Sequence, residues 1–267
     1  MTQAPVTPAT PAKTRAQISE STLRKDPWWR SPAVTAAFLA VVVVYLTWAS
    51  LVNADYIWGP YISPLYSPCL AETCTPGDSS FFLVPWLTWL TPAIIIIGGP
   101  MGFRVTCYYY RKAYYRAFWR SPAACAVREP HAKYTGETRI PLILQNLHRY
   151  FFWIALAFNV FLTYDAVIAF KNYQGQWGHM GLGTLVLIVN AALLWLYSLS
   201  CHACRHAVGG RLKHFSRHPV RYRMWTMVSR LNARHMEFAW VSLTWVLLTD
   251  LYIRLVASGI ISDLRFF

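Results

Sequence analysis

The chain has 267 residues, of which 55% are hydrophobic and only 13% are charged, and its mean hydropathy is positive at +0.29. Soluble domains carry about 25% charged residues, so this composition excludes an ordinary soluble protein and indicates long apolar segments. The formal net charge of +14 lies outside those segments and favours anionic lipid headgroups or an acidic protein surface as partners, rather than nucleic acid.

The N-terminal residues 1–31 are polar and rich in Pro and Thr, and they predict a disordered cytoplasmic tail. No apolar core precedes Pro32, so no cleavable signal peptide is expected. Trp28 and Trp29, next to Arg30, are typical of an interfacial anchor because indole rings prefer the depth of the headgroups.

Five apolar segments have the length of a membrane-spanning helix, which needs about 20 residues. They cover residues 33–52, 82–103, 140–170, 181–204 and 236–261. No helix breaker occurs between Val105 and Trp119, so the second helix is expected to continue beyond the membrane. The sequence therefore predicts an all-α transmembrane bundle of five helices over residues 32–267, in a multi-pass protein of the cell membrane.

Basic residues gather in two of the segments between these spans. The first group is Arg104, Arg111, Lys112, Arg116, Arg120, Arg128, Lys133 and Arg139, and the second is Arg205, Arg211, Lys213, Arg217, Arg221, Arg223, Arg230 and Arg234. The 53–81 loop has acidic residues but no Lys or Arg, and the linker after the third span has only Lys171. The positive-inside rule therefore predicts a cytoplasmic N-terminus and an external C-terminus.

The six cysteines divide between the two predicted sides. Cys69 and Cys74 lie in the external loop, where an oxidising compartment favours a structural disulfide. The other four are predicted on the cytoplasmic side, where thiols are reduced, catalytic or metal-bound: Cys107, Cys125, Cys201 and Cys204.

The segment Cys201-His-Ala-Cys204-Arg-His206 is the most informative motif of the chain. If the fourth helix continues through it, Cys201 and Cys204 lie one turn apart on one face. His148 in the third span and His235 at the start of the fifth fall at a similar depth. Ionisable side chains at membrane depth are costly and usually functional, so these residues are expected to converge.

Two thiols with two imidazoles suit either zinc or a Rieske-type [2Fe–2S] centre, whereas two histidines alone suit haem b. Zinc at this depth would be structural. A haem or an iron–sulfur centre there indicates electron transfer to a lipid-soluble carrier, which is a quinone.

Five predicted spans, a cytoplasmic N-terminus, the helix-embedded Leu147-His148-Arg149-Tyr150 and the Cys201–His206 motif resemble the membrane-anchor subunit of actinobacterial succinate dehydrogenase. The likeness covers the chain from about Pro32 to its end. Five-helix anchors of this kind bind one or two haems b, and one mycobacterial-type branch carries a Rieske-type cluster instead. Histidines are scarce in the outer halves of the spans, which departs from the dihaem pattern.

The resemblance implies that the chain docks an iron–sulfur subunit, itself joined to a succinate-oxidising flavoprotein subunit, on its basic cytoplasmic face, and that it reduces menaquinone in the respiratory chain. A small extra membrane subunit is a further expected partner. Cys201 and Cys204 are assigned to one iron of a [2Fe–2S] cluster and His148 and His235 to the other, with His202, His206 and Cys107 as substitutes.

Quinone reduction needs hydrogen-bond donors and a proton route, and the expected quinone-binding residues are Arg149, Tyr150, Arg234 and Glu237. Three alternatives stay open. The chain could be an anchor that binds haem b through His148 and a second histidine. It could instead be a cofactor-free anchor, or a transporter, although the sequence has no inverted repeat.

Overall fold

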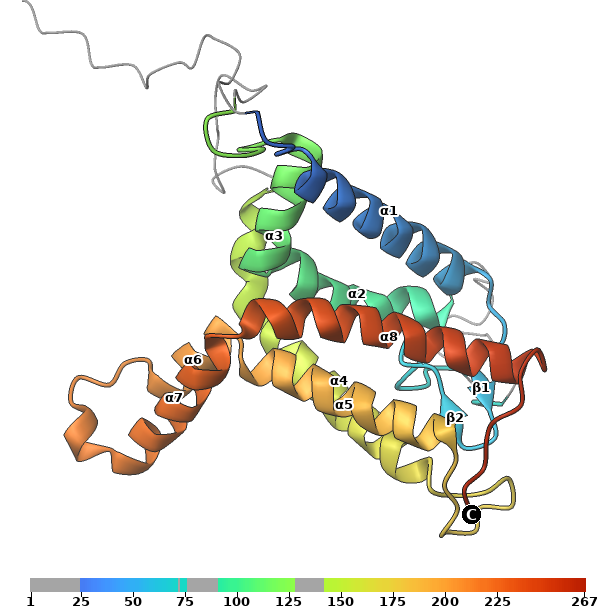
Figure 1. Ribbon diagram of the computed structural model, residues 1–267. Coiled ribbons are helices and arrows are strands. Elements are labelled where there is room, and N and C mark those ends of the chain that lie inside the picture. The colour runs from blue at the N-terminus through green and yellow to red at the C-terminus, as the bar shows by residue number, and fades with distance from the viewer. Residues whose placement is uncertain (1–24, 72, 76–90, 128–141) are drawn as a thin grey trace, which may run out of the picture. The chain divides into compact units, whose positions relative to one another are not determined.

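The structure, a computed structural model, describes residues 25–71, 73–75, 91–127 and 142–267. Most of the predicted tail, 1–31, lies outside these ranges. The regular secondary structure of the described chain is helical apart from one short β-hairpin, in agreement with the predicted all-α class (Figure 1). The helices are α1 (Arg30–Leu51), α2 (Pro92–Thr106), α3 (Tyr108–Tyr114), α4 (His148–Ile168), α5 (Leu182–Leu199), α6 (His202–Gly209), α7 (Pro219–Asn232) and α8 (His235–Ala257).

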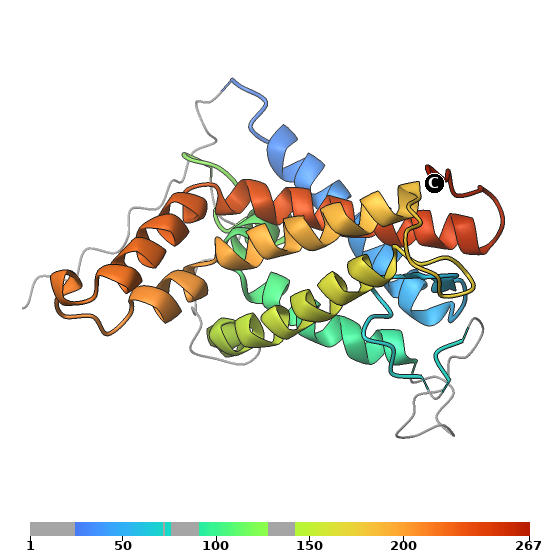
Figure 2. The ribbon, with the colours of Figure 1, turned by 90° about the horizontal axis from the view of Figure 1, so that it is seen from below.

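The chain divides into two compact units. One comprises residues 1–39 and 112–134, and the other comprises residues 40–111 and 135–267. The smaller unit contains the beginning of α1 and a π-helical turn, Tyr115–Trp119. In the larger unit α4 packs against α2 and α5, and α5 packs against α8 (Figures 1 and 2). The helices α6 and α7 follow α5 and precede α8 in the chain, and they pack against each other as a hairpin. Everything discussed below lies in the larger unit unless stated.

Four helical segments of the described chain are long and apolar enough to cross a membrane: Arg30–Leu51, Ile143–Ile168, Leu182–Leu199 and His235–Ala257. The predicted span 82–103 corresponds to α2, which is apolar but has 15 residues. Its helix begins at Pro92, because the side chain of Thr91 accepts the backbone N–H of Ile94 and proline favours the first helical position. Residues 82–90 lie outside the described ranges, so a fifth span stays a prediction.

Two helices predicted to be continuous are interrupted, and both interruptions fall on a cysteine. The predicted helix through residues 181–204 ends at Leu199, and Cys201 is extended (φ −66°, ψ 146°) before α6 begins. The expected continuation of the second helix likewise ends at Thr106, where Cys107 is extended (φ −65°, ψ 135°). Neither break contains proline or glycine. At the first break the thiol of Cys201 caps α6 by accepting the N–H of Ala203.

The remaining span boundaries shift by a few residues. A 3₁₀ turn, Leu142–Leu147, precedes α4, so the regular helix begins at His148 rather than at residue 140. The helix α8 ends at Ala257, not at residue 261, because Gly259 takes a positive φ of 75° that closes the helix.

At the end of the bundle away from His148 and His235, a short hairpin of β1 (Ile57–Trp58) and β2 (Tyr61–Ile62) packs on α8. Tyr61 is buried and donates a hydrogen bond of 2.8 Å to Asp263, and burial raises the pKa of its hydroxyl to about 12, so Tyr61 remains a donor. Cys69 and Cys74 form a disulfide in the loop that follows.

The same end holds a buried ion pair on α8. Arg254 lies 2.8 Å from Asp250, and the two side chains are 5% and 0% exposed. Arg254 also donates to the carbonyls of Ala49 and Ala54, while Asp250 accepts from Tyr45 on α1 and from Ser63. This network ties α8 to the end of α1 and to the loop that leads into the hairpin.

Candidate metal centre

Two cysteine–histidine pairs lie where α2, α4, α5 and α8 meet the α6–α7 hairpin. His148 Nε2 is 3.1 Å from Cys201 Sγ, and His235 Nε2 is 3.5 Å from Cys107 Sγ. These four residues are called the Cys/His centre below. Cys107, Cys201 and His235 are at most 3% exposed, and His148 is half-buried.

Local helix geometry explains how each side chain arrives there. His148 and His235 are the first residues of α4 and α8, and Cys107 and Cys201 occupy the two extended breaks after α2 and α5. A side chain at a helix end can point along the helix axis toward a neighbouring helix end, which a residue in mid-helix cannot do. Four helix ends therefore converge on one small region.

The hydrogen bonds of the imidazoles leave both Nε2 atoms available as ligands. Thr106 Oγ1 lies 2.8 Å from His148 Nδ1 and already donates its proton to the carbonyl of Gly102. The hydroxyl must therefore accept from His148 Nδ1–H. An acceptor for the second ring N–H, which fixes the imidazole tautomer, is a common feature of histidine metal ligands, and here the acceptor is a hydroxyl.

Ser200 repeats this arrangement for the second histidine. Its Oγ lies 2.7 Å from His235 Nδ1 and donates to the carbonyl of Tyr197. His235 consequently has its proton on Nδ1, and its Nε2 lone pair faces Cys107. Sequence reasoning did not identify Thr106 and Ser200 as partners of the histidines, because each lies beside a ligand candidate rather than in a motif.

Aromatic rings cover both imidazoles. Phe103 stacks on His148 with ring centroids 4.8 Å apart, and Tyr197 stacks on His235 at 5.1 Å. The rings of Phe103 and Tyr197 are themselves 5.1 Å apart. The four rings form a continuous row from one histidine to the other, which holds each imidazole in a single orientation.

The two pairs are also close to each other. The thiol of Cys201 interacts electrostatically with those of Cys107 and Cys204, and His235 interacts with His148. Within the described residues, however, no three Cys, His, Asp or Glu side chains are arranged to hold one metal ion. The arrangement is thus two thiol–imidazole pairs rather than the ligand set of a single ion.

Cys204 differs from its expected place. It is buried on α6, but in the described part of the chain it forms no hydrogen bond with either histidine, and Cys107 is the thiol that contacts His235. His202 and His206, also on α6, are exposed. The helix break at Cys201 separates that residue from α6, which carries His202, Cys204 and His206.

Two of the residues expected to bind quinone, Arg149 and Arg234, directly adjoin His148 and His235 of the Cys/His centre in the chain. Arg149, Tyr150, Arg234 and Glu237 are all exposed near the starts of α4 and α8. The guanidinium of Arg149 lies 5.7 Å from the ring centroid of Tyr150. None of the four lines the cavity described next.

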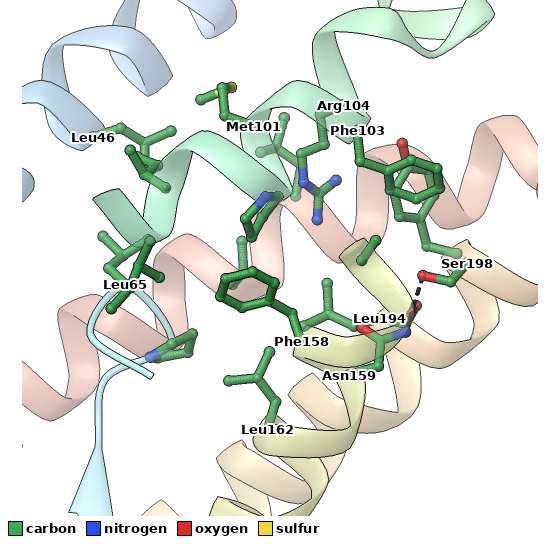
Figure 3. Close-up of a pocket in the computed structure, with 18 residues that line it drawn as sticks. Leu46, Leu65, Met101, Phe103, Arg104, Phe158, Asn159, Leu162, Leu194 and Ser198 are labelled. Carbon is green, nitrogen blue, oxygen red and sulfur yellow. Dashed lines mark hydrogen bonds between the residues drawn. The ribbon is translucent and has the colours of Figure 1, made fainter. Parts of the chain in front are cut away.

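A cavity of about 70 Å³ lies inside the bundle next to the Cys/His centre (Figure 3). It is several times larger than the roughly 10–15 Å³ that one water molecule needs. Its walls are mostly apolar, and Phe103 and Tyr197, the rings stacked on the two histidines, form part of them. Polar groups come from Arg104, Asn159 and Ser198, with Asn159 donating to Ser198 at 2.9 Å.

Arg104 is the charged group of this cavity and is only 8% exposed. It donates to the hydroxyl of Tyr110 at 2.6 Å and to the carbonyl of Ala239 and the hydroxyl of Ser242 at 3.3 Å. These described partners are all neutral. A buried cation held by neutral groups is costly unless an anionic group comes near it.

Comparison with known proteins shows the family to which this chain belongs. The model of the actinobacterial succinate dehydrogenase subunit SdhC matches residues 30–259. A chain of the solved structure of the Mycobacterium smegmatis Sdh1 complex in the apo form is 54% identical, with a TM-score of 0.85, and the match covers 96% of this chain and 98% of that chain. No curated protein matches.

A family match over 230 residues, together with four apolar helices of membrane-spanning length, identifies the class of protein. The chain belongs to the SdhC subunits of actinobacterial succinate dehydrogenases and is an integral membrane subunit of that oxidoreductase.

Proposed function

We propose that this subunit anchors succinate dehydrogenase in the cell membrane and carries electrons from its iron–sulfur subunit to menaquinone through a Rieske-type [2Fe–2S] cluster. The observation that carries the proposal is the pair of thiol–imidazole contacts, at 3.1 and 3.5 Å, in which both imidazoles present an unprotonated Nε2. A Rieske-type centre needs two thiolates and two neutral imidazoles, and the Cys/His centre provides that set.

The donor set supports Cys107 and Cys201 as ligands of one iron and His148 and His235 as ligands of the other. This changes one member of the set expected from sequence, because Cys107 replaces Cys204. A two-iron cluster needs only two protein ligands on each iron, so it does not require three residues around one ion, and the described residues contain no such three-residue group. When bound, the cluster supplies one-electron transfer.

Haem b would use the two histidines but gives the thiols no role. Each imidazole Nε2 that would bind haem iron already faces a thiol sulfur at 3.1 or 3.5 Å. The cluster therefore fits the neighbours of both histidines better than haem does. Haem remains a distinct outcome of the test given below.

The orientation and the partner surface follow from charge. We place the N-terminus and the α6–α7 hairpin in the cytoplasm and the C-terminus outside, with five spans that include α2. Exposed basic side chains lie on and beside the hairpin: Arg211, Lys213, Arg217, Arg223 and Arg234. The base of this hairpin, between Cys201 and His235, adjoins the Cys/His centre, so an iron–sulfur subunit that docks on this surface would bring its own electron donor toward the cluster.

The cavity beside the Cys/His centre is the proposed site of the menaquinone ring. Its apolar walls suit a flat ring, and Arg104, Asn159 and Ser198 offer hydrogen-bond donors for the ring carbonyls. The rings of Phe103 and Tyr197 separate the cavity from the two histidines by a single aromatic layer. The exposed residues Arg149, Tyr150, Arg234 and Glu237 stay an untested prediction.

Purification of the complete complex tests the cofactor. Chemical analysis should find two more irons and two more acid-labile sulfides than the soluble subunits contain, and electron paramagnetic resonance of the reduced complex should show a Rieske-type signal. A haem absorption band without that signal would replace the cluster by haem b. Absence of both would leave a cofactor-free anchor.

A pair of substitutions on α4 tests the quinone site. Ala155 lines the cavity, whereas Ala157 on the same helix is exposed. Ala155→Phe should fill the cavity and raise the KM for a soluble menaquinone analogue at least tenfold, with succinate oxidation by an artificial acceptor unchanged. Ala157→Phe should leave both unchanged. Equal quinone kinetics in the two variants would place the quinone elsewhere.

A further inference from the structure

The hydroxyl of Tyr197 is a buried polar group without a partner in the described part of the chain. The side chain is 2% exposed, and no described group meets its hydroxyl with hydrogen-bond geometry. Leaving a hydroxyl buried and unpaired costs free energy, because the group loses its hydrogen bonds to water and gains none in return. A phenylalanine would avoid this cost, so the hydroxyl needs an explanation.

Ring packing does not explain it, because the neighbouring histidine is packed without a hydroxyl. Phe103 stacks on His148 with planes 9° apart, and Tyr197 stacks on His235 with planes 3° apart. The two arrangements are equivalent except for the one oxygen atom. The chain therefore places a donor group on the His235 side of the row of rings and leaves the His148 side apolar.

The surroundings of that hydroxyl point to sulfur. Tyr197 interacts with the thiol of Cys107, the residue whose Sγ lies 3.5 Å from the imidazole under the tyrosine ring. The thiol of Cys201 also interacts electrostatically with Tyr197. The guanidinium of Arg104 lies over the tyrosine ring, 4.8 Å from the ring centroid. A cation over a phenol ring draws electron density from it and makes its O–H a stronger donor.

We propose that Tyr197 is a positioning residue that donates its hydroxyl proton to a sulfur of the centre, the Cys107 thiolate, and thereby sets the reduction potential of the cluster. The proposal rests on the proposed function. A hydrogen bond to a sulfur ligand stabilises the reduced form, which carries one more negative charge, and so raises the potential. Arg104 strengthens the same bond through the ring and is not itself a ligand.

The test uses the purified complex and a redox titration of the cluster signal by electron paramagnetic resonance. Tyr197→Phe keeps the ring that stacks on His235 and removes only the hydroxyl. We expect the signal to persist and the reduction equilibrium to fall about tenfold, which for a one-electron couple is a decrease of about 59 mV. Tyr61→Phe, which removes a buried hydroxyl at the opposite end of the bundle, should leave the potential unchanged.

A second variant covers the case in which Tyr197→Phe does not assemble. Site-specific replacement of Tyr197 by 3-fluorotyrosine keeps the shape and makes the hydroxyl a stronger donor, so the potential should rise. In deuterated buffer, the wild-type signal should also show coupling to one exchangeable deuteron that Tyr197→Phe lacks. An unshifted potential in either variant that retains the cluster would overturn the proposal. Absence of any cluster signal from the wild-type complex would instead overturn the proposed function.

Discussion

The thiol of Cys107 lies 3.5 Å from Nε2 of His235, although 128 positions separate these two residues in the chain. The first occupies a break after α2 and the second begins α8. Their contact is the second thiol–imidazole pair of the Cys/His centre, beside the pair formed by His148 and Cys201. It also identifies a thiol that the cysteine spacing of the sequence does not single out.

Serine substitutions should show which of two candidate thiols, Cys107 or Cys204, is a ligand of the cluster. Cys107→Ser should remove the cluster, so that its iron and acid-labile sulfide fall to the background of the soluble subunits, because a serine hydroxyl does not replace thiolate at iron. Cys204→Ser should retain at least most of both. The measurement is metal and sulfide analysis of the two complexes side by side. The reverse pattern would restore Cys204 as the ligand and remove Cys107.

The hydroxyl partners of the histidines should affect cluster retention. In Thr106→Val and Ser200→Ala the imidazole Nδ1–H loses its acceptor, and loss of such a partner typically weakens metal binding about 10–100-fold. Both variants should lose iron faster than the wild type during incubation with a chelator. Thr244→Val is the matched control, because Thr244 is exposed and, among the described residues, its hydroxyl donates to the carbonyl of Trp240 on its own helix. Equal rates of iron loss in all three would show that the hydroxyls do not hold the ligands.

The buried ion pair of α8 should dominate the stability of the opposite end. Asp250→Asn leaves Arg254 as an uncompensated buried charge, which should cost about 3–5 kcal/mol. The thermal unfolding midpoint of the detergent-solubilised complex should fall accordingly. The double variant with Asp250→Asn and Arg254→Met should recover most of the loss, because it removes the stranded charge as well. A double variant less stable than Asp250→Asn would contradict this account.

The proposed orientation can be checked with a membrane-impermeant thiol reagent. Cys125, in the smaller unit, is exposed and lies in the first basic segment. It should react in inside-out vesicles and not in intact spheroplasts. Gln174, in the linker between α4 and α5, is also exposed. A cysteine introduced there by Gln174→Cys, in a Cys125→Ser background, should show the opposite preference. The same preference at both positions would contradict the predicted topology.

Apolar length was enough to locate the four long apolar helices of the described chain, because a span needs a run of residues that few soluble segments match. The helix ends were harder to predict, because local hydrogen bonds set them. Thr91 starts α2 by accepting the N–H of Ile94, and Gly259 closes α8 by its positive φ. Both signals are present in the sequence but are outweighed by the apolar run around them.

The breaks at Cys107 and Cys201 carry no sequence signal at all. Neither has the proline or glycine that usually interrupts a helix, and each extended cysteine is held by contacts with residues far along the chain. The depth of each residue in its predicted span was enough to predict that His148, Cys201 and His235 lie in one region. Which second thiol meets them depends on these breaks, and this is why sequence spacing favoured Cys204.

The break after α5 places two consecutive residues against two different helices. Ser200 meets His235 of α8 at 2.7 Å, Cys201 meets His148 of α4 at 3.1 Å, and Asn232 holds the carbonyl of Ser200 at 2.7 Å. Insertion or deletion of one residue there would disrupt the contact of Ser200 with His235 and the contact of Cys201 with His148 at the same time. The 210–218 turn of the hairpin has largely exposed side chains, and within the described chain the ring of Phe215 and the carbonyl of Gly210 contact α7 rather than His148 or His235. Changes of length during evolution should therefore collect in that turn and avoid positions 200 and 201.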